Sequence, residues 1–218
     1  MKYKAAVFDM DGTILNTIDD LRDSVNAVLA HFGYPKRSPE EIRAFVGGGS
    51  YQLIRMALPE GCSKKIVDEV HDFYRPYYAA HSEIKTAPYP GIVELLSKLK
   101  AAGLKLAVVS SKPDGPVNTL CKKYFDGVFD ISIGDRPDLE RKPAPDALFL
   151  ALKELGVDKD EAVFTGDSEY DIAIAKNAGV FGIAVSWGYR DRDLLAGLGP
   201  GSIADSCEDI ERIILGEH

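Results

Sequence analysis

The sequence has few of the residues from which disulfide frameworks and zinc sites are built. Its 218 residues include three cysteines, Cys62, Cys121 and Cys207, and no C-x-x-C pair. An odd number of widely spaced cysteines is typical of the reducing cytoplasm and predicts neither disulfides nor a zinc site. The four histidines have no metal-ligand spacing either, so we assign them no metal.

Positive charge and long apolar stretches are also scarce. Lys and Arg total 26 against 34 Asp and Glu, which gives a formal net charge of −8. Because nucleic acids and anionic membranes are bound through clustered cations, this balance argues against both partners. No apolar stretch approaches the length of a membrane span, and the opening MKYKAAVFD lacks the form of a signal peptide. We therefore expect a cytoplasmic protein, and the oligomeric state is left open.

Short apolar runs alternate with amphipathic helical patterns along most of the chain. The runs typical of buried strands lie at 5–8, 104–110, 128–134, 162–167 and 181–186. Helical patterns lie between them at 92–103, 146–156 and 171–179, and each ends at a glycine that can stop a helix. This alternation predicts an α/β protein with a Rossmann-like parallel sheet, covered by helices on both faces.

The alternation stops between 16 and 86, where about seventy residues show helical patterns and no convincing strand. One helix has an apolar face made of Leu21, Val25, Val28, Leu29 and Phe32, and further helices are expected near 40–45, 51–58 and 63–78. Such a segment is longer than the usual connection between parallel strands. We therefore predict two domains, an α/β core formed by 1–15 and 87–218 and an inserted helical domain at 16–86.

Acidic, basic and hydroxyl side chains stand at or just beyond the carboxyl ends of four predicted strands. They are Asp9 with Asp11, Ser110 with Ser111, Lys142, and Asp167 with Asp171. Open parallel sheets bind ligands beyond the carboxyl ends of their strands, so these distant parts of the chain should meet there. Carboxylates packed this closely raise one another's pKa unless a cation compensates.

Mg²⁺ is the predicted cation, because hard oxygen ligands without His or Cys favour it over zinc. It usually binds only one or two protein carboxylates, which leaves one acid for covalent chemistry and another for proton transfer. Any anionic substrate of this acidic chain would depend on such a local cation.

Asp9 suits the role of nucleophile, since an aspartate is ionised at neutral pH and needs no base before it attacks phosphorus. Asp11 is placed to protonate a leaving alcohol and then to deprotonate a water. Gly12 permits a tight turn beside an anion. Ser110 is suited to hold a phosphoryl oxygen, and Lys142 to neutralise the charge that develops on it.

These motifs resemble those of the haloacid dehalogenase superfamily, in its phosphatase branch, and they occur in the same order. VFDMDGTIL is similar to the first motif, and VVSSKPD, RKPAPD and GDSEYD to the second, third and fourth. The inserted helices resemble the cap domain of that superfamily. FVGGGSYQLIRMAL and VSWGYRDRDLL look closest to its phosphoglycolate phosphatase and pyrophosphatase-like members.

The resemblance implies an aspartyl-phosphate intermediate at Asp9 and acid–base work by Asp11. It also implies Mg²⁺ held by the Asp9 carboxylate, the Asp11 backbone carbonyl and Asp167. The sequence departs from the pattern at Ser110, where Thr is common, and at Ser111, where Asn is common. Both departures keep a hydrogen-bonding group.

Three further residues have two interpretations each. Asp171 lies in Ser168-Glu-Tyr-Asp171, which fits a helix capping box, so its carboxylate caps the helix, holds a water on the metal, or does both. Gly48, in a glycine triplet before a helix, either leads flexibly into that helix or lets the backbone reach the substrate. Arg55 either meets an anion of the substrate or lies on the surface.

The leading hypothesis is a Mg²⁺-dependent phosphatase of a small phosphorylated metabolite, with phosphoglycolate as the first named substrate on resemblance alone. A phosphomutase similar to β-phosphoglucomutase would carry similar motifs and differ in its cap, and a pyrophosphatase remains open as well. A phospho-receiver module is the alternative from another class, because it also combines acids, a hydroxyl and a lysine on a parallel sheet.

Overall fold

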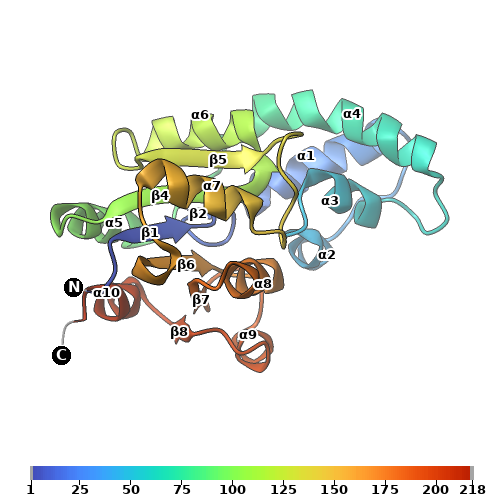
Figure 1. The fold of residues 1–218 in the computed structure, drawn as a ribbon. Coiled ribbons are helices and arrows are strands. Elements are labelled where there is room, and N and C mark those ends of the chain that lie inside the picture. The colour runs from blue at the N-terminus through green and yellow to red at the C-terminus, as the bar shows by residue number, and fades with distance from the viewer. Residues whose placement is uncertain (1, 217–218) are drawn as a thin grey trace.

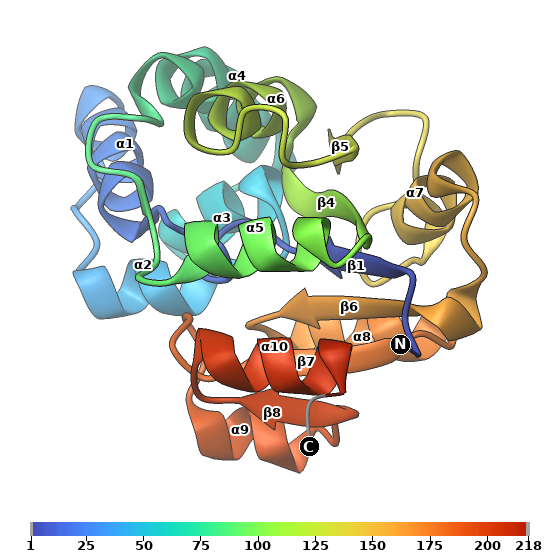
Figure 2. The same ribbon diagram turned by 90° about the vertical axis from the view of Figure 1, so that its left-hand side faces the viewer.

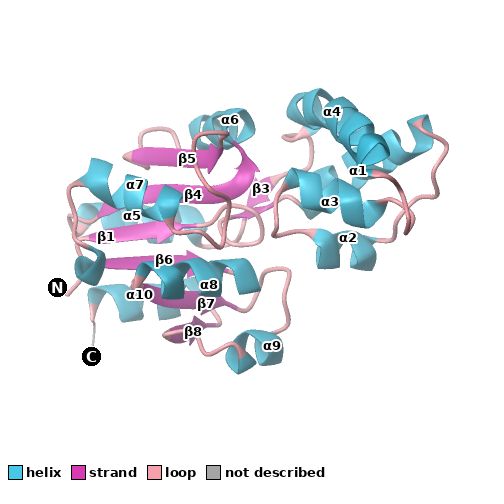
Figure 3. Ribbon diagram, turned by 45° about the vertical axis from the view of Figure 1, so that its right-hand side comes forward, coloured by secondary structure: helices cyan, strands magenta, loops and turns pink. Residues whose placement is uncertain are grey.

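A parallel sheet of six strands forms the centre of the fold. The computed structural model describes residues 2–216, and its six-stranded sheet has the order β5-β4-β1-β6-β7-β8. The strands are β1 (Ala5–Phe8), β4 (Lys105–Pro113), β5 (Ile131–Asp135), β6 (Ala162–Gly166), β7 (Phe181–Val185) and β8 (Ser202–Ala204). Every pair of neighbours is parallel, so the predicted α/β fold with a parallel sheet is confirmed (Figure 3).

Helices cover both faces of this sheet. One face packs against α5 (Ile92–Ala101), α6 (Asp114–Tyr124) and α10 (Cys207–Leu215), and the other against α7 (Asp146–Leu155) and α8 (Glu169–Ala178). Figure 2 shows α5 and α10 in front of the sheet and α8 behind it. Alternate residues of β1 serve the two layers, since Ala6 and Phe8 join the first cluster and Ala5 and Val7 the second.

Several elements at the margins were not predicted. The edge strand β8, the helix α6 and the short helix α9 (Arg192–Gly197) lie in segments for which we made no assignment. The expected strand at 128–134 begins only at Ile131, and the one at 104–110 extends to Pro113. The chain enters the inserted segment at β2 (Leu15–Asn16) and returns to the sheet at β3 (Ala87–Pro88). These two crossings pair as a small antiparallel ribbon.

Four helices between the crossings form a helical insert, α1 to α4. They are α1 (Ile18–His31), α2 (Pro39–Phe45), α3 (Ser50–Ala57) and α4 (Lys64–His81). Their apolar faces make a hydrophobic cluster apart from the two around the sheet, and Figure 1 shows them to one side of the sheet. These four helices lie where the sequence patterns predicted helices. The assignment of 16–86 as a separate domain stays a prediction. Within residues 2–216, no helix has the length and apolarity to cross a membrane.

Candidate active site

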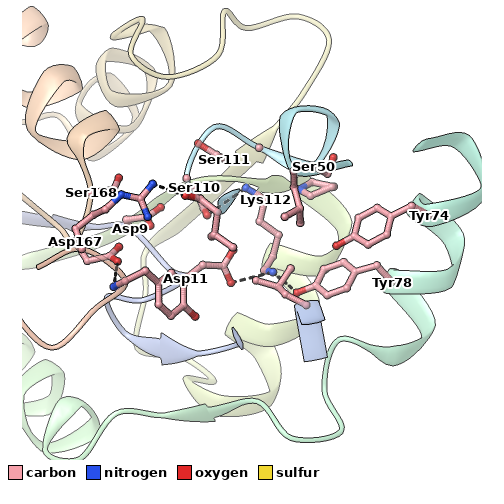
Figure 4. Close-up of a pocket in the computed structure, with 18 residues that line it drawn as sticks. Asp9, Asp11, Ser50, Tyr74, Tyr78, Ser110, Ser111, Lys112, Asp167 and Ser168 are labelled. Atoms are coloured by element: carbon pink, nitrogen blue, oxygen red, sulfur yellow. Dashed lines mark hydrogen bonds and ion pairs between the residues drawn. The ribbon is translucent and has the colours of Figure 1, made fainter. Parts of the chain in front are cut away.

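The candidate active site lies at the carboxyl end of β1, near the centre of the sheet. β1 pairs with β4 on one side and β6 on the other, and such a switch in strand order is where open parallel sheets bind ligands. Asp9 directly follows β1, Ser110 is carried by β4, and Asp167 directly follows β6. Figure 4 shows these three residues and Asp11 around one cavity. The structure therefore brings these four predicted residues together.

Three carboxylates and one lysine form the centre of the site. Oxygen atoms of Asp9, Asp167 and Asp171 all lie within 4.8 Å of one another. Lys142, from the loop between β5 and α7, has its Nζ 2.8 Å from Asp9 Oδ1 and 2.9 Å from Asp171 Oδ1. Only 4% of the lysine side chain is exposed, so one positive charge faces three acids in a buried region.

The pKa values of these groups reflect a shortage of positive charge. Burial raises the pKa of Asp9 to about 7, against the lowering effect of Lys142 and with a further rise from Asp171. Burial, together with the charges of Asp171 and Asp9, holds the pKa of Asp167 well above its ordinary value. Burial alone would lower the pKa of Lys142, but the two neighbouring carboxylates raise it to about 12. A further cation would favour the ionised acids.

The donors at this centre suit a metal ion. The metal-compatible cluster found among residues 2–216 consists of carboxylates alone, and carboxylate oxygens are ligands for hard cations. Two glycines leave room for the Asp167 side chain: a Cβ on Gly12 would lie 2.3 Å from its Oδ2, and a Cβ on Gly188 2.2 Å from its Cβ. Gly12 has a φ of +81°, which other residues rarely adopt. The predicted tight turn at Gly12 thus lies against the Asp167 carboxylate.

Hydrogen bonds orient the two acids that follow β6. Asp167 Oδ2 accepts the backbone N–H of Tyr189 at 2.7 Å. Asp171 Oδ2 accepts the backbone N–H of Ser168 at 3.1 Å and its hydroxyl at 2.6 Å, as in the predicted capping box at the start of α8. Because its other oxygen contacts Lys142, Asp171 caps the helix and holds the lysine at once. Its contact with a metal-bound water stays a prediction.

The Asp11 carboxylate faces Lys112 and not the three-carboxylate centre (Figure 4). Asp11 Oδ1 accepts the Thr17 hydroxyl at 2.6 Å and lies 3.0 Å from Lys112 Nζ. Lys112 also donates to the Tyr78 hydroxyl from α4. Thr17 is held in turn, because its N–H donates to the Tyr189 hydroxyl at 3.0 Å. Side chains from both the sheet edge and the helical insert therefore fix Asp11, whose acid–base and metal-binding roles stay predictions.

A cavity that is partly open to solvent separates the sheet edge from the helical insert. Residues of the sheet edge line one end, namely Asp9, Asp11, Ser110, Ser111 and Asp167. Residues of the helical insert line the other end, namely Leu21, Val46, Gly47, Gly49, Ser50, Leu53, Tyr74 and Tyr78. The predicted Gly48 and Arg55 instead line a neighbouring hollow with Lys142, where substrate binding by them stays a prediction.

Sequence reasoning assigned no role to several residues that shape the site. Lys112 directly follows Ser110 and Ser111, and its position at a strand end was a usable signal. Tyr74 and Tyr78 are four residues apart on one helix, which is also the spacing of an ordinary core face. Tyr189 lies within VSWGYRDRDLL, and the resemblance of that segment to the family was the usable signal for it.

Two arginines join the helical insert to the loop after β7. Arg43 of α2 donates from Nη2 to the Gly188 carbonyl at 2.6 Å and from Nε to the Tyr189 carbonyl at 3.0 Å. Arg190 donates back, to the Arg43 carbonyl at 3.0 Å and the Val46 carbonyl at 2.8 Å. We call these reciprocal contacts the arginine seam. They hold the insert over the cavity in this structure.

Comparison with known proteins agrees with this geometry. A family model described as haloacid dehalogenase-like hydrolase matches residues 6–185. A phosphoglycolate phosphatase of Pseudomonas syringae pv. tomato is 35% identical over 219 residues, covering 98% of this chain and 79% of the relative. That of Aquifex aeolicus is 31% identical over 191 residues, covering 85% of this chain and 86% of the relative.

Solved structures extend the comparison to three dimensions. A protein from Lactobacillus delbrueckii subsp. bulgaricus is 40% identical, with a TM-score of 0.94 and coverage of 100% of both chains. A predicted phosphoglycolate phosphatase from Haemophilus somnus is 28% identical, with a TM-score of 0.90 and 98% coverage of both chains. Both the predicted fold class and the predicted family are confirmed. The chain belongs to the haloacid dehalogenase-like hydrolases, a family of enzymes.

Proposed function

We propose that this chain is a Mg²⁺-dependent phosphatase of a small phosphorylated metabolite, and that phosphoglycolate is its substrate. The observation that carries the proposal is Asp9 at the end of a central strand, 2.8 Å from a buried lysine and within 4.8 Å of two further acids. The relatives named phosphoglycolate phosphatase at 31–35% identity support the choice of substrate. The buried carboxylates support the choice of a hard cation.

Asp9 and Asp167 are the side chains that would hold Mg²⁺, with the Asp11 backbone carbonyl as a third ligand from the chain. When bound, Mg²⁺ would offset the negative charge of the acids and of the phosphoryl oxygens. The cationic side chains at this site do not offset that charge fully. Among residues 2–216, Lys142 is the only cationic side chain that contacts Asp9 in the structure.

In the first half-reaction, a carboxylate oxygen of Asp9 attacks phosphorus, and the bond from phosphorus to the leaving oxygen breaks. Asp11 donates its proton to that oxygen, so the leaving oxygen departs as a hydroxyl group and not as an alkoxide. The Lys142 ammonium and the Ser110 hydroxyl are suited to bind the phosphoryl oxygens as charge accumulates on them. The product of this step is an aspartyl phosphate on Asp9.

In the second half-reaction, water attacks the phosphorus of the aspartyl phosphate. Asp11, now ionised, takes the proton from that water, and the bond between phosphorus and Asp9 breaks. Inorganic phosphate leaves, and both acids return to their starting states. Asp11 thus serves as acid first and base second, which suits its place beside the cavity and outside the three-carboxylate centre.

We assign residues 16–86 the role of a cap that excludes bulk water and selects the leaving group. Their own hydrophobic cluster and their side chains on the cavity wall support this assignment. A cytoplasmic setting belongs to the same proposal, supported by cysteines that are all free in the structure.

A panel of phosphorylated metabolites tests the proposal. Purified protein with Mg²⁺ is assayed for phosphate release, and kcat/KM is compared for phosphoglycolate, sugar phosphates, nucleotides and pyrophosphate. We expect the highest value for phosphoglycolate and no turnover in EDTA until Mg²⁺ is restored. A phosphomutase would isomerise a sugar phosphate without releasing phosphate, and a receiver module would show no turnover at all; either outcome would overturn the proposal.

A further inference from the structure

The cavity wall contributed by the helical insert contains a buried hydroxyl without a partner. Tyr74 is 1% exposed, and its hydroxyl has no hydrogen-bond partner among the described residues. Its ring stacks on Tyr78, with centroids 5.5 Å apart and planes at 8°. Figure 4 shows the Tyr74 hydroxyl directed toward the space between Ser50 and Lys112. A buried donor left in this state is available to a ligand that enters the cavity.

Lys112 brings a positive charge to the same end of the cavity. It is buried, and its Nζ lies between Asp11 Oδ1 and the Tyr78 hydroxyl. The Tyr78 hydroxyl holds the Lys112 ammonium on the side of the helical insert. The Tyr74 ring stacks on the Tyr78 ring there. The lysine is therefore placed between the catalytic acid and the leaving-group end of the cavity.

The start of α3 adds a third set of donors. Gly49 is the N-cap of this helix and supplies no side-chain acceptor for the first turn, so the first backbone N–H groups are available to a ligand. Gly49 and Ser50 line the cavity, and the helix dipole there favours an anion. The Ser50 hydroxyl itself is paired with His71 Nε2 at 2.9 Å, which leaves the backbone as the free donor.

We propose that the Tyr74 hydroxyl, the Lys112 ammonium and the first turn of α3 form a subsite for a carboxylate on the leaving group. The inference rests on the proposed phosphatase function and names the residues that select its substrate. All three groups donate hydrogen bonds. Of the acids on the cavity wall, Asp11 is the one that contacts the subsite, through its ion pair with Lys112 at 3.0 Å. A substrate with phosphate at one end and carboxylate at the other would meet hydrogen-bond donors at both ends.

Tyr74 is suited to be the selective element of this subsite. Burial raises the pKa of its hydroxyl well above the ordinary value, so the hydroxyl remains a donor at neutral pH. Phenylalanine would keep the ring that stacks on Tyr78 and would remove only the unpartnered group. The hydroxyl makes no hydrogen bond in the substrate-free protein, so it is free to donate one to a ligand.

The test compares two substrates that differ in the carboxylate. Tyr74→Phe and wild type are assayed with phosphoglycolate and with ethyl phosphate, which has the same number of carbons and no carboxylate. Because a hydrogen bond to a charged group is strong, we expect kcat/KM of the variant to fall by roughly tenfold to a hundredfold for phosphoglycolate. For ethyl phosphate we expect a change of less than about twofold, within the range of a substitution that removes no contact.

Tyr77→Phe is the matched control. Tyr77 lies on the same helix and stacks on His81 at 4.2 Å, but it does not line the cavity. We expect both substrates to be unaffected in this variant. The thermal midpoint of Tyr74→Phe should equal or exceed that of wild type, which separates a lost ligand contact from a damaged fold.

Equal losses on both substrates, or no loss on either, would overturn the subsite. So would a wild type that turns over ethyl phosphate as well as phosphoglycolate, although the phosphatase function would then survive. Calorimetric binding of phosphoglycolate to the Asp9→Asn protein, with and without Tyr74→Phe, tests the subsite without turnover. If Tyr74→Phe weakens this binding by roughly tenfold to a hundredfold, the result supports the subsite even if the protein releases no phosphate. Unchanged binding overturns the subsite.

Discussion

Replacing Lys142 by methionine tests whether this lysine holds the three buried acids together. Methionine is of similar length and carries no charge, so the change removes the contacts of 2.8 and 2.9 Å to Asp9 and Asp171 with little loss of volume. Removing one partner of a buried ion pair costs about 3–5 kcal/mol, because the remaining charges are left uncompensated. Each kcal/mol lowers the unfolding midpoint of a chain of this size by about 2–4 °C, so we expect a fall of about 6–20 °C in EDTA near neutral pH.

Lys153→Met is the control for this experiment, because Lys153 is exposed on α7. A surface substitution changes stability by less than about 0.5 kcal/mol, so its midpoint should move by no more than about 2 °C. Added Mg²⁺ should return part of the stability lost by Lys142→Met, since it supplies positive charge at the same acids. Turnover should fall by about 10²–10³-fold with the lost transition-state contact. Equal midpoints for the two variants in EDTA would refute the electrostatic reasoning.

Three further changes probe other parts of the site. Asp9→Asn should abolish turnover and leave the circular dichroism spectrum unchanged, because the amide is a poor nucleophile; full activity would exclude the covalent step. In EDTA the pKa of Asp9 is about 7 in the folded state, against 3.8 for the ordinary group, so the folded state binds more protons than the unfolded state. Denaturant titrations should therefore show that the free energy of unfolding falls as the pH rises from about 4 to about 7, by at most about 4 kcal/mol from this group. A flat profile over that window would contradict the assignment. Gly12→Ala should lower stability by about 1–3 kcal/mol through its positive φ and its contact with Asp167, and should weaken Mg²⁺ activation; normal Mg²⁺ activation would count against this.

The positions of the main site residues could be predicted because one rule of sheet geometry decides them. The apolar run of β1 is four residues long and ends at an acid, so both its extent and the place of Asp9 were readable. Parallel strands share one carboxyl edge, which places Ser110 and Asp167 at the same edge as Asp9. Their closeness to Asp9 also depends on the pairing of β1 with β4 and β6, and the sequence alone did not predict that strand order.

The cavity wall on the helical insert could not be predicted in the same way. Gly47 and Gly49 line the cavity and Gly48 does not, because the rotation of a short loop depends on backbone angles that composition does not fix. Tyr74 has the spacing of a core residue and is buried like one, so only its unpartnered hydroxyl distinguishes it. Lys112 has a long side chain whose reach to Asp11 depends on packing around it.

The arginine seam gives the helical insert four hydrogen bonds whose acceptors do not titrate. Arg43 and Arg190 keep their charge at any pH of interest, and the four acceptors at 2.6–3.0 Å are peptide oxygens, which do not titrate. These four hydrogen bonds therefore persist over the pH range in which the acids beneath the insert titrate, whereas the pairing of Arg190 with the Glu169 carboxylate at 2.7 Å depends on pH. Main-chain acceptors do not depend on the side chains of their residues, although Gly188 is constrained separately by its closeness to Asp167.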